Sequence, residues 1–225
     1  MNNGTPIITI DGPSGSGKGT IAKLLAERLG WHLLDSGALY RVVGLLARRQ
    51  GISEDAAEQL AALAREMPLR FDAEGRALLA DEDVSLEIRS ETAGNQASKV
   101  AAVPAVRQAL LDWQRGYARP PGLVADGRDM GSVVFPNAEI KVFLTASAEE
   151  RANRRYKQLI EKGLDVNVAD LAADIRERDE RDRNRSLAPL VAPVAALELD
   201  STHLSIEQVM QQALDRVAQT FPDLL

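Results

Sequence analysis

The stretch GPSGSGKGT, residues 12–20, decides the fold class of this 225-residue chain. It follows a short apolar run, residues 6–11. The residues after it place four apolar side chains on one face of a predicted helix: Ile21, Leu24, Leu25 and Leu29. Strand, glycine-rich loop and helix in this order are typical of a phosphate-binding loop, or P-loop. Glycines let the backbone turn its N–H groups inward, and the helix start adds a positive dipole end.

The loop is therefore predicted to bind a nucleoside triphosphate, with Lys18 reaching the outer phosphates as a mobile point charge. The spacing departs by one residue from GxxxxGK[ST], because Gly19 stands where a hydroxyl is usual and Thr20 follows. The alternative is a glycine-rich turn without a ligand, which the coincidence of four glycines, a lysine and both flanks disfavours. The predicted donor-binding residues are Gly12, Pro13, Ser14, Gly15, Ser16, Gly17, Lys18, Gly19 and Thr20.

Composition narrows the class of protein. Apolar content of 45% and charged content of 27% are ordinary for a globular chain. The net charge of −6 argues against a general nucleic-acid or membrane-surface binder. The absence of cysteine excludes disulfides and thiol catalysis. Neither a secretory signal nor a membrane-spanning apolar run is visible, so a cytoplasmic enzyme is expected.

Further buried strands are predicted at 31–34, 123–126, 140–144 and 197–199, with helices between them, which indicates an open parallel sheet. Polar residues stand at the ends of the strands at 31–34 and 123–126, and ligands bind at such strand ends. Ser36 is expected to cap the helix that begins there. Asp126 ends the strand at 123–126 and is predicted to orient magnesium or its waters; a purely structural role is the alternative.

The middle of the chain interrupts this alternation. A helix over 54–66 ends at Pro68, and residues 69–84 read as short antiparallel strands with a turn at 72–75. A polar helix at 91–102 contains Ser98. Pro104 opens the next helix, whose apolar stripe leaves Arg107 at its margin, where an arginine is usually solvated.

Two arginine-bearing helices are predicted at about 148–162 and 168–184, joined by residues 163–165. Within the second, one face carries Arg178, Arg181, Asp182 and Arg185, spaced i, i+3, i+4 and i+7. An exposed, salt-bridged helix is the ordinary reading of such a run. In a protein that binds a triphosphate, however, guanidinium groups suit a lid over a phosphoryl-transfer site.

Five motifs occur in an order that resembles the bacterial cytidylate kinases, which are P-loop nucleoside monophosphate kinases. They are GPSGSGKGT at 12, DSGALYR at 35, ASKVAA at 97, DGRDMGSVVFP at 126 and RDERDRNR at 178. Together they cover most of the chain, and the family's GKGT accounts for Gly19. The resemblance implies one α/β kinase domain with a five-stranded parallel sheet, a small antiparallel β insert and a helical lid. The implied regions are a core (about 1–35, 104–147 and 190–225), an NMP-binding region (36–103) and the lid (148–188).

The resemblance also implies roles for individual residues. Ser98, Arg107 and Asp129 match positions that recognise cytosine, and Arg178 and Asp182 match sugar contacts. The positions around the monophosphate are Ser36, Arg41, Arg128 and Arg185, of which the three arginines join Lys18 as the implied catalytic residues. Arg154 is assigned to the donor nucleotide, while the roles of Arg151 and Arg155 in the lid stay open.

The implied reaction is transfer of the γ-phosphoryl group of ATP, with Mg²⁺, to CMP or dCMP. The implied partners are these nucleotides alone, with neither nucleic acid nor membrane, and the chain is expected to be a monomer. Rival readings are a kinase for UMP, AMP or a small alcohol such as shikimate. A GTPase-type switch is a different class, disfavoured because the chain has no NKxD segment. A regulatory protein that binds nucleotide without turnover also remains open.

Overall fold

The computed structural model describes residues 4–72, 75–161, 163 and 165–224. It divides into two compact units, one made of residues 1–34 with 117–225 and the other of residues 35–116. Each unit has its own sheet. The first contains the P-loop, and the second contains the predicted β insert.

A five-stranded sheet with the order β2-β6-β1-β7-β8 forms the centre of the first unit. Its strands are β1 (Ile7–Asp11), β2 (His32–Asp35), β6 (Leu123–Gly127), β7 (Ile140–Thr145) and β8 (Leu197–Asp200). β1 pairs in parallel with β6 and β7, and β7 with β8. Every residue of β1 and β6 is buried, as expected for central strands covered on both faces. The predicted parallel sheet is confirmed.

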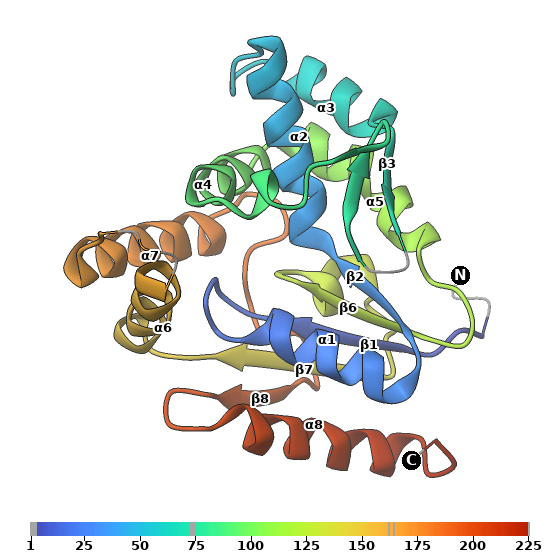
Figure 1. Cartoon of the computed structure of the whole chain (residues 1–225). Helices are drawn as coiled ribbons and strands as arrows, with labels where there is room; N and C mark the ends of the chain where they lie inside the picture. The colour runs from blue at the N-terminus through green and yellow to red at the C-terminus, as the bar shows by residue number, and fades with distance from the viewer. Residues whose placement is uncertain (1–3, 73–74, 162, 164, 225) are drawn as a thin grey trace. The chain divides into compact units, whose positions relative to one another are not determined.

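The helices of this unit are α1 (Lys18–Leu29), α6 (Ala148–Glu161), α7 (Val168–Arg183) and α8 (Ile206–Thr220), with a short π-helical segment η2 at Met130–Val134. Side chains of α1 and α8 share one hydrophobic core with Ile8, Ile10 and Val142 of the sheet. Helices α6 and α7 follow β7 and lie side by side at the left of Figure 1. Leu164, in the connection predicted between them, lies outside the described residues.

The second unit contains α2 (Ser36–Gln50), α3 (Ala57–Glu66), η1 (Glu87–Arg89), α4 (Glu91–Val100) and α5 (Pro104–Gly116). Strands β3 (Leu69–Phe71), β4 (Ala77–Leu79) and β5 (Glu82–Asp83) form a separate antiparallel sheet. The β insert is thus confirmed, although residues 73 and 74 of the predicted turn lie outside the described residues.

Two boundaries differ from the sequence-based expectation. The N-cap of α2 is Asp35 rather than Ser36, because the Asp35 carboxylate accepts a hydrogen bond from Ala38 N at 3.1 Å and Ser36 is already helical. Helix α5, assigned above to the core, lies in the second unit, where it packs against α3. Its Trp113 meets Phe71 of the insert edge to face at 6.3 Å. Helix α5 thereby becomes part of the unit that holds the insert.

No helix in the described ranges combines the length and the apolar character that a membrane crossing requires.

Candidate active site

The P-loop joins the end of β1 to the start of α1. Gly12 has φ 153°, and a Cβ there would lie 2.0 Å from the carbonyl oxygen of Leu144, so only glycine fits. Gly17 adopts a left-handed conformation (φ 92°) directly before α1 and provides no side-chain cap. The buried Lys18 donates from Nζ to the Pro13 carbonyl at 3.1 Å. The ammonium group therefore folds back over the loop, beside an uncapped helix start that suits an anion.

Two arginines of α6 support the outer side of this loop. Arg151 donates to the Ser14 carbonyl at 3.0 Å, and Arg154 donates to the Ser16 carbonyl at 3.4 Å. Arg154 also donates to the Ser201 carbonyl, just beyond β8, at 2.6 Å. The predicted donor-binding role of Arg154 stays a prediction, but its guanidinium group does lie against the P-loop backbone.

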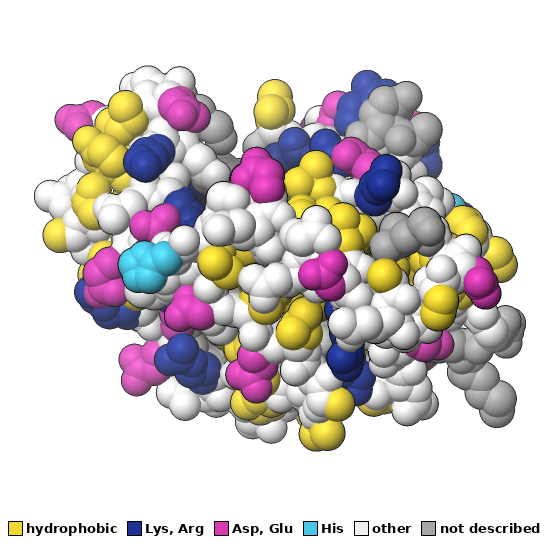
Figure 2. All heavy atoms as spheres, turned by 90° about the horizontal axis from the view of Figure 1, so that it is seen from below, with side chains coloured by type: hydrophobic (Ala, Val, Ile, Leu, Met, Phe, Trp, Pro, Cys, Tyr) yellow, Lys and Arg dark blue, Asp and Glu magenta, His cyan; other side chains and the backbone are white. Residues whose placement is uncertain are grey.

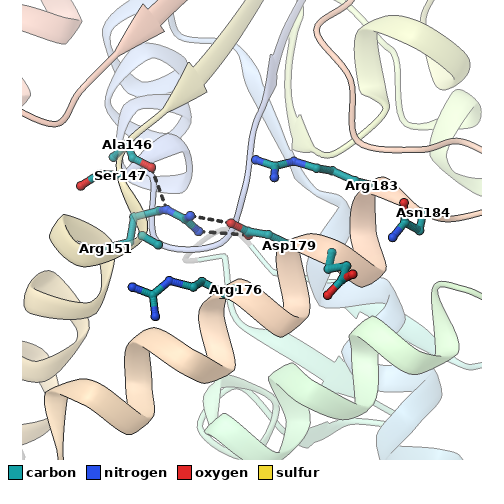
Figure 3. A pocket seen from close by; sticks show the side chains of 9 residues that line it. Ala146, Ser147, Arg151, Arg176, Asp179, Arg183 and Asn184 are labelled. Carbon is teal, nitrogen blue, oxygen red and sulfur yellow. Dashed lines mark hydrogen bonds and ion pairs between the residues drawn. The ribbon is translucent and has the colours of Figure 1, made fainter.

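Arg151 also joins α6 to α7. It forms a bidentate ion pair with Asp179 (3.0 and 2.5 Å) in which both side chains are buried. The pair lies on the wall of a cavity of about 540 Å³ (Figure 3), whose lining also includes Arg176, Arg183 and Asn184. The residues that line this cavity include no P-loop residue and no predicted substrate contact. Arg151 therefore has a structural role that the sequence left open.

Asp126, at the end of β6, lies beside the unusual glycine of the P-loop. A Cβ on Gly19 would stand 3.1 Å from Asp126 Oδ2, so the carboxylate occupies the space next to the position where other P-loops carry a hydroxyl. Carboxylate oxygen is a hard ligand of the kind that Mg²⁺ prefers. The described residues contain no cluster of three or more metal-ligating side chains. The residues present therefore fit a magnesium ion that would be held largely by nucleotide phosphates, with Asp126 as the carboxylate that would orient it.

A buried carboxylate gathers several of the predicted acceptor-binding arginines. Asp182, on α7, is 1% exposed; it accepts a hydrogen bond from Arg128 Nε at 3.0 Å and forms an ion pair with Arg185. Burial raises the pKa of this carboxyl, but the charges of Arg128, Arg185 and Arg178 outweigh it and hold the pKa below its ordinary value. The cluster is therefore an ionised carboxylate surrounded by guanidinium groups.

One member of the predicted arginine face points elsewhere. The half-buried Arg181 forms its ion pair with the exposed Glu177 of the preceding turn of α7. The helix ends at Arg183, so Arg185 lies beyond it and still reaches Asp182. The face expected from spacing alone is thus reduced to Arg178, Asp182 and Arg185.

Sequence reasoning gave no role to Asp11, the last residue of β1. This carboxylate is fully buried and accepts hydrogen bonds from Met130 N at 2.7 Å and Gly131 N at 2.8 Å. Burial raises its pKa to about 7, although the two backbone hydrogen bonds by themselves lower it. The negative charges of Asp129 and Asp126 add to the rise. A carboxylate directly before the P-loop was the only signal in the sequence.

The second unit holds the other predicted acceptor contacts. Arg107 is 6% exposed, which corrects the expectation that an arginine at the margin of the stripe is solvated. It donates to the Ala101 carbonyl at 3.2 Å and lies over the Tyr40 ring, 5.5 Å from its centroid. Ser36 and Ser98 are buried. Arg41 donates to the carbonyls of residues 88 and 90, at 2.6 and 3.3 Å.

A P-loop at the end of the central strand β1, together with two arginine-bearing helices after β7, defines a P-loop kinase. The family model for cytidylate kinase matches residues 8–219. The chain belongs to the cytidylate kinase family.

Curated relatives agree over nearly the whole length. A cytidylate kinase of Edwardsiella ictaluri is 61% identical over 218 residues, covering 96% of this chain and 97% of the relative. One from Methylococcus capsulatus is 58% identical over 219 residues, covering 96% and 99%. Among solved structures, a gluconokinase from Sinorhizobium meliloti superposes with a TM-score of 0.50 at 16% identity, covering 97% of this chain and 95% of that one. This last likeness supports the fold alone.

Proposed function

We propose that this protein transfers the γ-phosphoryl group of ATP to CMP or dCMP, giving ADP and CDP or dCDP. The observation that carries the proposal is the buried Asp182, which holds Arg128 and Arg185 in the same compact unit as the P-loop. Cationic side chains fixed in this way suit a phosphate acceptor. Family membership over residues 8–219 supports the identity of the acceptor.

The donor is bound by the P-loop. Backbone N–H groups of residues 12–20 surround the phosphates, Lys18 neutralises the outer ones, and Arg154 contacts the donor nucleotide. Bound magnesium would neutralise and orient the donor phosphates, and Asp126 would orient the ion or its waters. Gly19 leaves space for the Asp126 carboxylate, since a side chain there would crowd Oδ2 at 3.1 Å.

The acceptor is bound by three groups of residues, one each for its phosphate, its sugar and its base. Arg128 and Arg185, together with Ser36 and Arg41, bind the monophosphate, while Arg178 and Asp182 bind the sugar. The cytosine ring is recognised by Ser98, Arg107 and Asp129. The low pKa of Asp182 keeps it ionised at neutral pH, so it orients the arginines and accepts hydrogen bonds throughout the working range.

The chemical step needs no general base. An oxygen of the acceptor phosphate, which is mostly a dianion at neutral pH because its second pKa is about 6, attacks the γ-phosphorus. The bond from that phosphorus to the β–γ bridging oxygen breaks, and the electron pair leaves with ADP. Lys18, Arg41, Arg128 and Arg185 offset the charge of two approaching polyanions, and a closed lid excludes water that would otherwise hydrolyse ATP.

The test is ADP formation from ATP with CMP, dCMP, UMP, AMP, shikimate or no acceptor, each with Mg²⁺ and with EDTA. We expect rapid turnover with CMP and dCMP, and none with EDTA. Equal or faster turnover of UMP, AMP or shikimate would reject the assigned acceptor. ADP release without an acceptor would indicate an ATPase or a switch.

Location in the cytoplasm, a monomeric state and the lack of nucleic-acid binding stay predictions. Figure 2 shows one face on which acidic and basic side chains are interspersed, so the coloured side chains in this view form no continuous basic patch. Light scattering across a range of protein concentrations tests the monomer, and a salt-dependent shift with duplex DNA would contradict the last prediction.

A further inference from the structure

The turn after β6 lacks a capping contact that its sequence could make. Arg128 and Asp129 follow the strand, and η2 begins at Met130. Asp129 occupies the N-cap position, yet its side chain makes no capping hydrogen bond. An aspartate at this position usually accepts from the first N–H groups of the segment that follows, as Asp35 does for α2.

Asp11 makes these contacts from another strand. Its Oδ1 accepts from Met130 N at 2.7 Å, and its Oδ2 accepts from Gly131 N at 2.8 Å. The parallel register places Asp11 opposite Gly127, so the carboxylate meets the first residues beyond β6. The fit is close, because a Cβ on Gly131 would lie 2.6 Å from Thr9 Oγ1. The hydrogen bonds of the Asp11 carboxylate thus define where this turn can lie.

The origin of these hydrogen bonds has a consequence for the acceptor. Asp11, rather than the N-cap residue Asp129, accepts from the first two N–H groups of η2, those of Met130 and Gly131. Arg128, one residue earlier, is held where its Nε reaches Asp182 at 3.0 Å. We propose that Asp11 is a positioning residue for the acceptor nucleotide, because it fixes the turn that presents Arg128 and Asp129; the inference rests on the proposed function.

The competing role for Asp11 is support of the P-loop, which begins at the next residue. Both hydrogen bonds of its carboxylate go to the turn, whereas the P-loop carbonyls of Ser14 and Ser16 are held by Arg151 and Arg154. Loss of the Asp11 carboxylate is therefore expected to weaken binding of the acceptor CMP and not binding of the donor ATP.

The test is Asp11→Asn, which keeps the shape but turns one acceptor into an N–H donor that faces another N–H group. We expect the KM for CMP to rise about tenfold or more, which corresponds to the loss of one hydrogen bond to a charged group. The KM for ATP should change less than about twofold, a difference below the size of one lost hydrogen bond. An equal rise in both KM values, or an unchanged KM for CMP, would overturn the proposal.

Two further variants keep the test decisive if the Asp11→Asn protein folds poorly. Gly131→Ala pushes the turn away from β1 without altering any carboxylate, and it should also raise the KM for CMP selectively. Thr9→Val is the matched control: Thr9 is equally buried on β1, and its hydroxyl makes no hydrogen bond within the described part of the chain. It should leave both KM values unchanged. The wild-type reaction with CMP is measured first, since its failure would refute the proposed function rather than the role of Asp11.

Discussion

Asp182 Oδ2 accepts a hydrogen bond from Arg128 Nε at 3.0 Å, although the two residues are 54 positions apart and belong to different elements. The carboxylate is 1% exposed, and Arg185 is its second ion-pair partner. A buried charge of this kind is retained only when it is paired. Asp182 therefore holds Arg128 and Arg185 in position through its two carboxylate oxygen atoms.

Asp182→Asn should weaken binding of the acceptor CMP more than binding of the donor ATP. The amide keeps the volume but leaves Arg128 and Arg185 without their shared counter-charge, so we expect the KM for CMP to rise about tenfold or more and the unfolding free energy to fall by about 3 kcal/mol. Steady-state kinetics and urea unfolding measure the two effects. Asp174→Asn, an exposed carboxylate on the same helix, is the control. An equal rise in the KM for ATP would argue against an acceptor-specific role.

Lys18→Met should remove most turnover while the fold survives. The ammonium group is buried and bonded to the Pro13 carbonyl at 3.1 Å, and its charge is assigned to the outer phosphates. Loss of such a group lowers kcat by about 10²–10³-fold. The measurement is CMP-dependent ADP formation together with thermal unfolding. Lys23→Met, at an exposed position of α1, should behave as wild type. Near-normal rates for the Lys18 variant would remove the P-loop lysine from the mechanism.

Arg107→Ala should relax discrimination among acceptor bases. The guanidinium group is buried, so the substitution also removes its hydrogen bond to Ala101 and its cation–π contact with Tyr40. We expect a stability loss of about 1–2 kcal/mol and a reduced preference for CMP over UMP and AMP. Relative kcat/KM values for the three acceptors decide the point. Arg115→Ala, on the exposed side of α5, controls for charge. An unchanged preference would exclude Arg107 as a contact to the base.

Asp11 should give stability an unusual pH dependence. Its folded pKa is raised from 3.8 to about 7, so between these values the unfolded chain releases a proton that the folded chain retains. The unfolding free energy should therefore fall as pH rises through this window, by up to about 1.4 kcal/mol per pH unit from this group, and the contribution should be constant above it.

Urea unfolding of wild type and Asp11→Asn at pH 5, 6, 7 and 8, without nucleotide or Mg²⁺, isolates this contribution. The difference in unfolding free energy between the two proteins should change with pH below about 7 and level off above it. Asp182 should not interfere, because its pKa is lowered and its stabilisation is lost only at more acidic pH. Parallel pH profiles for the two proteins would contradict the raised pKa.

The local elements of this chain follow from its residues alone. Gly12 and Gly17 specify a backbone that side chains disfavour, so the P-loop could be recognised from its letters. Pro104 and Ser205 mark the starts of α5 and α8. Apolar periodicity predicted the parallel strands and the β insert. These features depend on neighbours along the chain, which a sequence displays directly.

Contacts between residues far apart in the sequence could be established from the folded structure alone. Arg107 is buried because Tyr40 lies under it, and periodicity along α5 alone had indicated solvent. Asp11 meets Met130 across 119 positions, and Asp126 lies beside Gly19, because β1 and β6 pair in a parallel register. Sheet order and register depend on packing of the whole unit. The sequence therefore identified the loop that is predicted to bind the donor, and the fold determined how the carboxylates and arginines around it are paired.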